Sequence, residues 1–335
     1  VAGPLSDRFG RKAVILTGSA LYCVAAVACW GAGSLDMLLA ARLIQGIGAA
    51  GPRTVSIAIV RDLYTGREMA RIMSFAMMIF TIVPAVAPLM GQAVIAVADW
   101  HAIFLVYVAF ALITMLWLGL RQPETLPPQD RRPLTPRSLM AASGQVLALR
   151  PVQLSIAAQS LTLGALFATL SSMQGIFEIR FDRADSFPLW FAVIAAASAS
   201  GSMLNARMVM RHGMRRVVTL TYAAVLSLTL LHLALVGTGA LSDTAAFGAH
   251  VLWCIALFAM MGLTMGNLNA LAMEPLGHVA GLAASLISSI ATVASVLLAI
   301  PVGLAFNGTN LPLLLGSAVF IAGALVLMLR MPSRG

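Results

Sequence analysis

Apolar runs long enough to cross a lipid bilayer recur along nearly the whole chain of 335 residues. A membrane-spanning α-helix needs about 20 apolar residues in succession. Runs of this order lie near residues 13–33, 37–60, 72–98, 102–120, 151–175, 188–206, 217–237, 247–273, 279–305 and 312–329. The sequence therefore predicts an all-α, polytopic membrane protein with about ten helices.

The composition supports this class of protein. Hydrophobic residues make up 60% of the chain and charged residues 10%, which leaves too little polar surface for a soluble domain of this size. The formal net charge of +9 would suit nucleic acid, but the basic residues lie in separate linkers and form no single patch. We therefore expect the chain to contact the lipid bilayer and no nucleic acid.

The linkers between the apolar runs alternate in charge. Short cytoplasmic loops of membrane proteins collect Lys and Arg. One set of alternate linkers holds most of the basic residues, namely Arg8, Arg11, Lys12, Arg61, Arg67, Arg71, Arg121, Arg131, Arg132, Arg137, Arg150, Arg207, Arg211, Arg215, Arg216, Arg330 and Arg334. The opposite set holds Arg180 and Arg183 beside acidic residues. This split predicts that the first polar loop and the C-terminus are both cytoplasmic.

The longest polar stretch, residues 121–150, separates two groups of apolar runs. It is rich in proline, which prevents a helix, so we predict a semi-rigid cytoplasmic linker there. Four apolar runs precede it within residues 1–120, and six follow it within residues 151–335. The sequence thus predicts two helical domains joined by this linker.

Residues 3–12 read GPLSDRFGRK and form a polar turn directly before the first apolar run. Gly10 suits a sharp reversal, because glycine accepts a positive φ without a side-chain clash. A plain topogenic turn, which only fixes orientation, is the simpler interpretation. The pattern GxLxDRxGRK also resembles the signature loop between the second and third helices of the major facilitator superfamily.

This resemblance has implications for the fold. It implies two six-helix bundles, of which the first two helices are missing here, so that residues 1–120 hold helices 3–6 and residues 151–335 the second bundle. Val1 is not an initiator Met, and no apolar run precedes the loop. We therefore expect a fragment of a longer protein, which by itself does not transport.

Two arginines lie inside the second apolar run. Arg42 and Arg53 are 11 residues apart, close to three helical turns, so they share one helix face about 16 Å apart along the axis. Gly46 and Ala49 lie between them on this face and leave it open. An intramembrane Arg is costly and usually faces a cavity or a partner. The alternative is that both side chains extend to opposite membrane interfaces.

Two motif matches fall in the same run. Residues 46–51 match the dinucleotide-binding pattern GxGxxG, but they lie in mid-helix and follow no strand, so we expect close helix packing instead. Residues 39–50, with the pattern LxxRxxQGxGAA, resemble the fourth-helix motif of proton-coupled antiporters in the superfamily. This resemblance implies that Arg42 and Gln45 line the substrate or proton pathway.

Acidic Asp62 follows this run at its cytoplasmic end. We predict that Asp62 joins Asp7, Arg8 and Arg11, next to the Gly10 turn, in a charge cluster that latches one conformation. The alternative is a solvated surface pair, which contributes less than about 1 kcal/mol.

Residues 84–92 of the third run read PAVAPLMGQ. Pro84, Pro88 and Gly91 in one spanning helix predict a kink and a close backbone contact. Gln92 is either a polar residue of the transport cavity or an interhelical hydrogen bond.

Two segments resemble one branch of the superfamily. Residues 84–92, followed by Asp99 and Trp100, resemble the bicyclomycin/chloramphenicol-resistance (Bcr/CflA) branch of drug:proton antiporters. Residues 266–275, which read GNLNALAMEP, resemble the same branch. Asn267 and Asn269 are the cavity candidates there, although amides also join helices.

The resemblance to this branch implies a proton-coupled antiporter that exports small amphipathic drugs or metabolites across a bacterial inner membrane. We expect a monomer with a small-molecule substrate, no catalytic residues, no metal and no cofactor, driven by the proton gradient. Three alternatives stay open. They are a metabolite importer of the same fold, a non-transporting receptor, and a membrane enzyme, for which the sequence offers no HExxH, GxSxG or acid pair at catalytic spacing.

Overall fold

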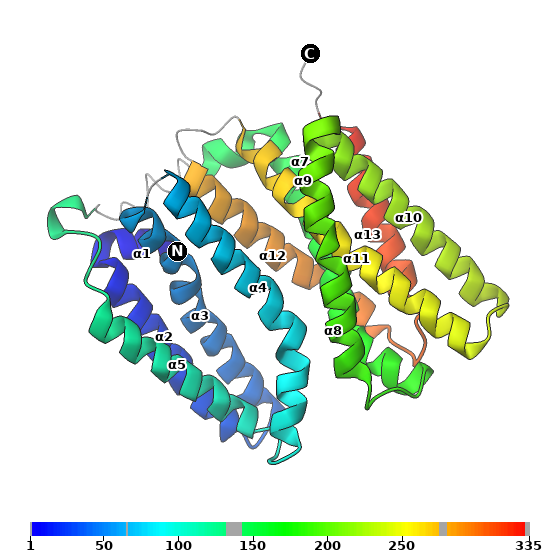
Figure 1. Ribbon diagram of the computed structural model, residues 1–335, viewed down its shortest axis with the longest axis horizontal. Helices are drawn as coiled ribbons and strands as arrows, with labels where there is room; N and C mark the ends of the chain where they lie inside the picture. Colours follow the sequence, from blue (N-terminus) through cyan, green and yellow to red (C-terminus); the bar gives the residue numbers. More distant parts are fainter. Residues whose placement is uncertain (1, 65, 132–142, 275–279, 332–335) are drawn as a thin grey trace. The chain divides into compact units, whose positions relative to one another are not determined.

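The computed structural model describes residues 2–64, 66–131, 143–274 and 280–331, and over these ranges the chain forms helices and connecting loops without a β-strand. The chain divides into two compact units, Val1–Pro136 and Arg137–Gly335 (Figure 1). The division falls within the 121–150 stretch that the prolines single out. Residues 132–142 of that stretch lie outside the described ranges.

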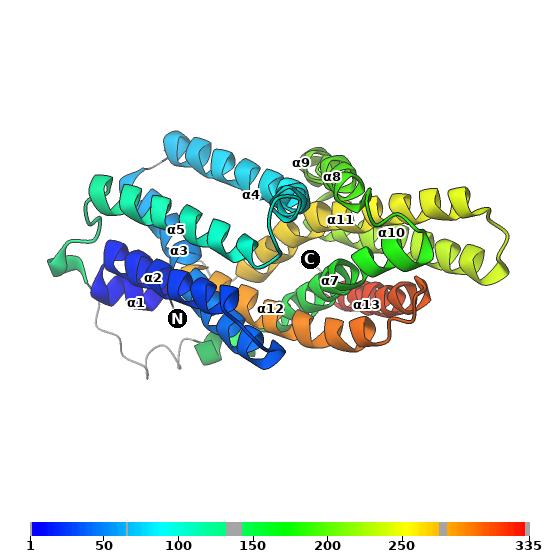
Figure 2. The same ribbon diagram turned by 90° about the horizontal axis from the view of Figure 1, so that it is seen from below.

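The first unit contains α1 (Ala2–Phe9), α2 (Arg11–Trp30), α3 (Leu35–Leu63), α4 (Gly66–Ile95) and α5 (Ala102–Arg121). Helix α2 packs against α3 on one side and α5 on another, and α1 contacts both α2 and α3 (Figure 2). A single 3-10 turn, η1 (Pro128–Asp130), interrupts the described part of the chain after α5. This arrangement places the two ends of the unit, α1 and the segment after α5, on the same side of α2 and α3.

The second unit contains α7 (Arg150–Gly175) with its π-helical extension η2 (Ile176–Arg180), α8 (Phe187–Ser198), α9 (Ser200–His212), α10 (Met214–Thr238), α11 (Asp243–Met273), α12 (Ala280–Leu304) and α13 (Leu311–Leu329). Helix α7 packs against α11, α12 and α13, and α10 packs against α11 and α13. The core of this unit is built around the fully buried side chains of Tyr222, Trp253 and Leu257.

The helices confirm the all-α, polytopic prediction. Within the described residues, nine helical segments are long and apolar enough to cross a membrane. Each of these nine segments coincides with a predicted run. The tenth run, 72–98, corresponds to α4, in which Val86–Ile95 is the described apolar part. The run at 188–206 is two helices that meet at Ala199. The second of them continues to His212, well beyond the predicted end.

The opening polar segment differs from the predicted turn. Its first residues form a helix, α1, and the reversal is confined to Gly10, whose φ of +99° lies in the region that favours glycine. The prediction of a sharp reversal at Gly10 is confirmed, and the prediction that residues 3–9 belong to the turn is wrong.

The glycines of the false dinucleotide motif allow α2 and α3 to approach closely. A Cβ atom on Gly48 would lie 2.6 Å from the backbone nitrogen of Tyr22, and one on Gly51 would lie 3.0 Å from the carbonyl oxygen of Val14. Backbone atoms cannot move away as a flexible side chain can. Gly46 differs, because a Cβ there would meet no heavy atom of the described residues within 4 Å. Close helix packing, rather than phosphate binding, therefore explains Gly48 and Gly51.

This contrast gives a first prediction. Gly48→Ala should destabilise the full-length protein by about 1–3 kcal/mol, because the new methyl group forces α2 and α3 apart. Gly46→Ala is the matched control, and it should be neutral or stabilising, because alanine favours the helix by up to about 1 kcal/mol. Unfolding titrations of the two variants in detergent measure the difference. Equal stability of the two variants would contradict the close crossing at Gly48.

Candidate functional site

Helix α3 presents two adjacent stripes with opposite properties. The buried stripe runs through Ala41, Gln45, Gly48, Val55 and Ile59. The neighbouring stripe contains Arg42, Gly46, Ala49 and Arg53, and all four residues are exposed. The structure thus places the two arginines on one open face, with small residues between them, as their spacing predicts.

Arg42 connects the open face to a buried polar group. Its guanidinium donates a hydrogen bond of 2.7 Å to Oε1 of Gln45, one turn further along α3. The Gln45 side chain is only 2% exposed, and the phenol of Tyr22 on α2 lies beside both groups. Gln45 therefore holds the guanidinium of Arg42 from the helix interface and does not itself line the open face.

The predicted charge cluster centres on Arg11 at the start of α2. Its guanidinium donates to Oδ1 of Asp7 at 2.5 Å, to Oδ2 of Asp62 at 3.1 Å and to the hydroxyl of Ser6 at 2.6 Å. The Arg11 side chain is 12% exposed, that of Asp62 is 23% exposed and that of Asp7 is 41% exposed. A single guanidinium, itself mostly buried, thus joins α1, α2 and the end of α3.

Arg8 is not part of this cluster. Its side chain is exposed, and its guanidinium lies 5.1 Å from the centre of the Phe9 ring. The helical form of α1 explains the difference, because residues in a helix diverge in direction even when they are close in sequence. Asp7 and Arg11, at a spacing of four, meet across the Gly10 reversal, whereas Arg8 points away from them.

Glu124, which follows α5, completes the cluster. It was not identified as a member from the sequence. Its two carboxylate oxygens accept hydrogen bonds from the backbone N–H groups of Arg11 at 2.8 Å and Lys12 at 3.1 Å. These are orphan donors at the start of α2, where Gly10 supplies no side-chain cap. A carboxylate at a helix N-terminus is also favoured by the helix dipole. A Cβ on Gly10 would lie 2.5 Å from this carboxylate, so the glycine also makes room for it.

Two further contacts tie α5 and its following loop to the cluster. The hydroxyl of Thr125 donates to Oδ2 of Asp62 at 3.1 Å, the same oxygen that Arg11 contacts. The amine of Lys12 donates to the carbonyl oxygen of Gly119 in the last turn of α5 at 2.8 Å. The cluster therefore holds the N-terminus of α2, the C-terminus of α3 and the exit from α5 together. We call it the Arg11 cluster, meaning Ser6, Asp7, Arg11, Lys12, Asp62, Glu124 and Thr125.

Helix α4 carries the proline motif as one continuous helix from Gly66 to Ile95. The close backbone contact predicted at Gly91 is absent, since no heavy atom of the described residues lies within 4 Å of where a Cβ would be. Pro88 is half-buried, and Gln92 is exposed. Pro84 lies within the helix. The small residue at position 91 leaves an open surface on α4 instead of a tight crossing.

Asn267 and Asn269 have different surroundings. The amide of Asn267 donates to Oδ1 of Asn205 on α9 at 2.7 Å and to the carbonyl oxygen of Leu263 at 2.8 Å, and the residue is 5% exposed. It therefore joins α9 to α11 in the way that amides join membrane helices. Asn269 is half-buried, and its Oδ1 has no partner among the described residues. Of the two, Asn269 keeps the properties expected of a cavity residue.

Comparison with known proteins identifies the family. The sequence model of the Major Facilitator Superfamily matches residues 1–299. The chain belongs to the Major Facilitator Superfamily. It is accordingly a multi-pass membrane protein of a transporter family and not an enzyme.

The chain is similar to three bacterial relatives that are named as transporters or resistance proteins. It is 29% identical over 304 residues to the uncharacterised MFS-type transporter YdgK of Bacillus subtilis, covering 86% of this chain and 71% of the relative. It is 29% identical to a bicyclomycin resistance protein homolog of Haemophilus influenzae, covering 66% and 56%. It is 28% identical to the multidrug resistance protein MdtL of Salmonella typhi, covering 61% and 50%. The chain thus spans about half the length of the two relatives that are named for resistance.

Solved structures share the fold. The crystal structure of a D-xylose-proton symporter matches with a TM-score of 0.76 at 14% identity, covering 99% of this chain and 83% of the other. The human organic anion transporter MFSD10 matches with a TM-score of 0.61 at 21% identity, covering 97% and 79%. At these identities the likeness concerns the fold alone.

Proposed function

We propose that this protein exports small amphipathic compounds across a bacterial inner membrane in exchange for protons, as a member of the Bcr/CflA branch. The observation that carries the proposal is the open face of α3, on which Arg42 lies seven residues inside a spanning segment that begins at Leu35. A cation at this depth is expensive unless it contacts a cavity, a ligand or a partner. Arg42 is held in place by Gln45 but remains exposed, so it is available to such a group.

Two features support the proposed direction of transport. The Haemophilus and Salmonella relatives are named for bicyclomycin and multidrug resistance, and export is the direction of transport that would protect a cell from such compounds. The proline motif at 84–92 on α4 is the second feature that resembles exporters. Arg53, Gln92 and Asn269 complete the proposed pathway, whereas Asn267 is left out because it joins two helices.

The Arg11 cluster is proposed to latch one conformation of the first unit. It joins the ends of three helices through one guanidinium and one carboxylate, so that a movement of any of the three must break several charged hydrogen bonds together. The charge pattern of the linkers supports a cytoplasmic position for this cluster and for the C-terminus. The proposal includes a monomer in the lipid bilayer and needs no cofactor, because the proton gradient supplies the energy.

Accumulation in cells tests this function. The full-length protein is expressed in a bacterial strain without its own drug exporters, and labelled chloramphenicol, bicyclomycin and amphipathic dyes are supplied. We expect lower accumulation of at least one compound, and we expect a proton uncoupler to restore it. Higher accumulation in cells that contain the protein would instead indicate import. Equal accumulation of every compound, with the protein present in the membrane, would contradict drug export.

A further inference from the structure

Two histidines lie together inside the second unit, where neither the family assignment nor the proposed export uses them. His232 is on α10 and His250 is on α11, and their ring centres are 5.7 Å apart. The rings are 2% and 0% exposed. Trp253 stacks against both, with ring-centre distances of 6.3 Å to His232 and 5.6 Å to His250. A histidine pair is an uncommon choice for the interior of a helical bundle, because apolar residues fill such positions without polar atoms.

The hydrogen bonds of this pair are incomplete. Nε2 of His232 contacts the amide nitrogen of Asn310 at 3.5 Å, and Nε2 of His250 contacts the sulfur of Cys254 at 3.8 Å. Both contacts are long. Nδ1 of each ring is buried and has no hydrogen-bond partner among the described residues. A buried polar nitrogen without a partner costs about 1–3 kcal/mol, so two of them side by side indicate a role other than packing.

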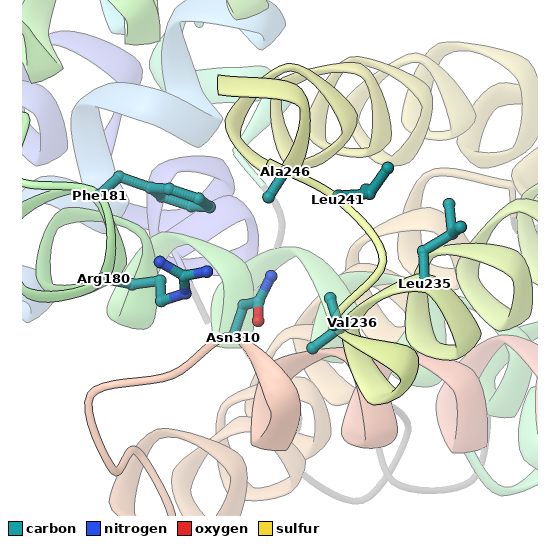
Figure 3. A pocket seen from close by; sticks show the side chains of 8 residues that line it. Arg180, Phe181, Leu235, Val236, Leu241, Ala246 and Asn310 are labelled. Carbon is teal, nitrogen blue, oxygen red and sulfur yellow. The ribbon is translucent and has the colours of Figure 1, made fainter. Parts of the chain in front are cut away.

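A small cavity of about 50 Å³ lies one residue away from the pair, because two of its lining residues, Phe181 and Asn310, separate it from the rings. Two of its lining residues contact the histidines: Asn310 meets His232, and the ring of Phe181 lies 5.6 Å from that of His250. Figure 3 shows Arg180, Phe181 and Asn310 on one side of this pocket, with Leu235 and Val236 of α10 on the other. A cavity of this size has room for water, which can carry a proton to the rings.

The charges around the pair come from one end of the unit. Arg180 lines the cavity and is paired with Asp243 at 3.2 Å, and Arg183 lies 4.5 Å from the ring centre of Phe247. The thiol of Cys254 is the other titratable group in contact with the pair. The acidic residues of the adjoining loop, namely Glu178, Asp182 and Asp185, are exposed. Helix α8, α12 and α13 contain no charged residue, and those of α7, α9 and α10 lie at their opposite ends.

We propose that His232 and His250 form a proton-binding site in the second unit, which exchanges protons through the cavity lined by Arg180, Phe181 and Asn310. Histidine is the side chain whose ordinary titration range lies nearest to neutral pH. The proton binds at one of the two free Nδ1 atoms and introduces a positive charge into a cluster without a buried carboxylate. The fraction of the pair that carries a proton therefore depends on how α10, α11 and α13 pack around the cavity. Proton binding in turn favours a packing in which water or the carboxylate of Asp243 reaches the charged ring.

The proposal goes beyond export, because a proton site in the second unit is independent of the transported compound and of its direction. It is also separate from the Arg42 face, which belongs to the first unit. Its test therefore needs no substrate.

Trp253 is a built-in reporter of this site. A protonated imidazole quenches a stacked indole more strongly than a neutral one, because it accepts an electron from the excited ring more readily. In a full-length variant whose other tryptophans are replaced by phenylalanine, we expect the fluorescence of Trp253 to fall reversibly when the pH is lowered from about 8 to about 4, a range that extends well below the ordinary histidine pKa of about 6.5. The fall should disappear when His232→Gln and His250→Gln are combined.

His212→Gln is the matched control, because His212 is exposed at the end of α9 and should leave the response intact. A fall that survives loss of both buried histidines, or no fall in the parent variant, would overturn the proposal. A second measurement needs no substitution. Nitrogen NMR of protein labelled at histidine should show two buried imidazoles that change protonation state over the same pH range, and two that keep one state throughout would also overturn it.

Discussion

Replacing Arg42 by alanine is expected to reduce export at least tenfold at equal protein levels in the membrane. Arg42 lies on the open face of α3, seven residues inside the spanning segment that begins at Leu35, and Gln45 holds it there with a hydrogen bond of 2.7 Å. Removal of the side chain removes a fixed positive charge from a low-dielectric environment, where its effect on a nearby carboxylate or substrate is largest. The readout is the rate of energy-dependent loss of a preloaded compound from cells.

Two further variants separate charge from geometry. Arg42→Lys keeps the positive charge but loses the planar guanidinium, so we expect it to retain part of the activity. Arg121→Ala is the control, because Arg121 is an exposed arginine at the end of α5, and it should transport at the parent rate. If Arg42→Ala and Arg121→Ala were equally active, Arg42 would be one more arginine that extends to a membrane interface, and the proposed pathway would lose its main residue.

The Arg11 cluster gives the second large effect. Arg11→Ala removes the hydrogen bonds to Ser6, Asp7 and Asp62 at once and leaves two carboxylates facing each other. We expect about a tenfold or larger loss of transport, with a shift toward the conformation that the cluster does not hold. Arg8→Ala should transport at nearly the parent rate, because the only interaction described for Arg8 is its contact with the ring of Phe9.

The comparison of Arg8 with Arg11 is decisive because the two residues carry the same positive charge and lie only three residues apart in the opening polar segment. If the loop only fixed the orientation of the protein, loss of either arginine would have the same small effect. Transport and accessibility of engineered cysteines at the two membrane faces measure the effect. Equal results for the two variants would exclude a latch that depends on Arg11.

Glu124 tests the same cluster from the other side of the chain. Glu124→Ala leaves the N–H groups of Arg11 and Lys12 without their carboxylate, which should cost about 0.5–2 kcal/mol of stability, as the loss of other helix caps does. Combination with Arg11→Ala should give less than the sum of the single effects, because both substitutions loosen the same contact between α2 and the exit of α5. Additive losses would show that the two residues act separately.

The sequence predicts those parts of the fold that depend on local pattern. The length of each apolar run determines where a helix can cross a membrane, so most helices from α2 to α13 follow the predicted runs, while α9 extends beyond its run to His212 and α4 begins before its run, at Gly66. A glycine at position 10 predicts the positive φ that the structure has there, and the spacing of Arg42 and Arg53 predicts that they share one face of α3. In each of these cases the information lies within a few turns of one helix.

Contacts between distant segments could not be predicted in this way. Glu124 caps Arg11 across 113 residues, and no local pattern marks an acid after α5 as a cap for α2. Asn267, which the sequence offered as a cavity residue, instead joins α11 to α9, because Asn205, 62 residues earlier, lies opposite it. The histidine pair is a similar case, since His232 and His250 look like isolated histidines until α10 and α11 pack together. Pattern therefore predicted the helices and the α3 face, but not the partners that give individual side chains their roles.

Substrate-induced proton release from inverted membrane vesicles tests the central claim most directly. Vesicles that contain the full-length protein are given a proton gradient, and a compound that the cells exclude is then added. The account predicts that the compound releases protons from the vesicle interior, and that Arg42→Ala abolishes this release while Arg121→Ala does not. Export without any proton movement, or a release that Arg42→Ala leaves unchanged, would contradict proton-coupled antiport through the open face of α3.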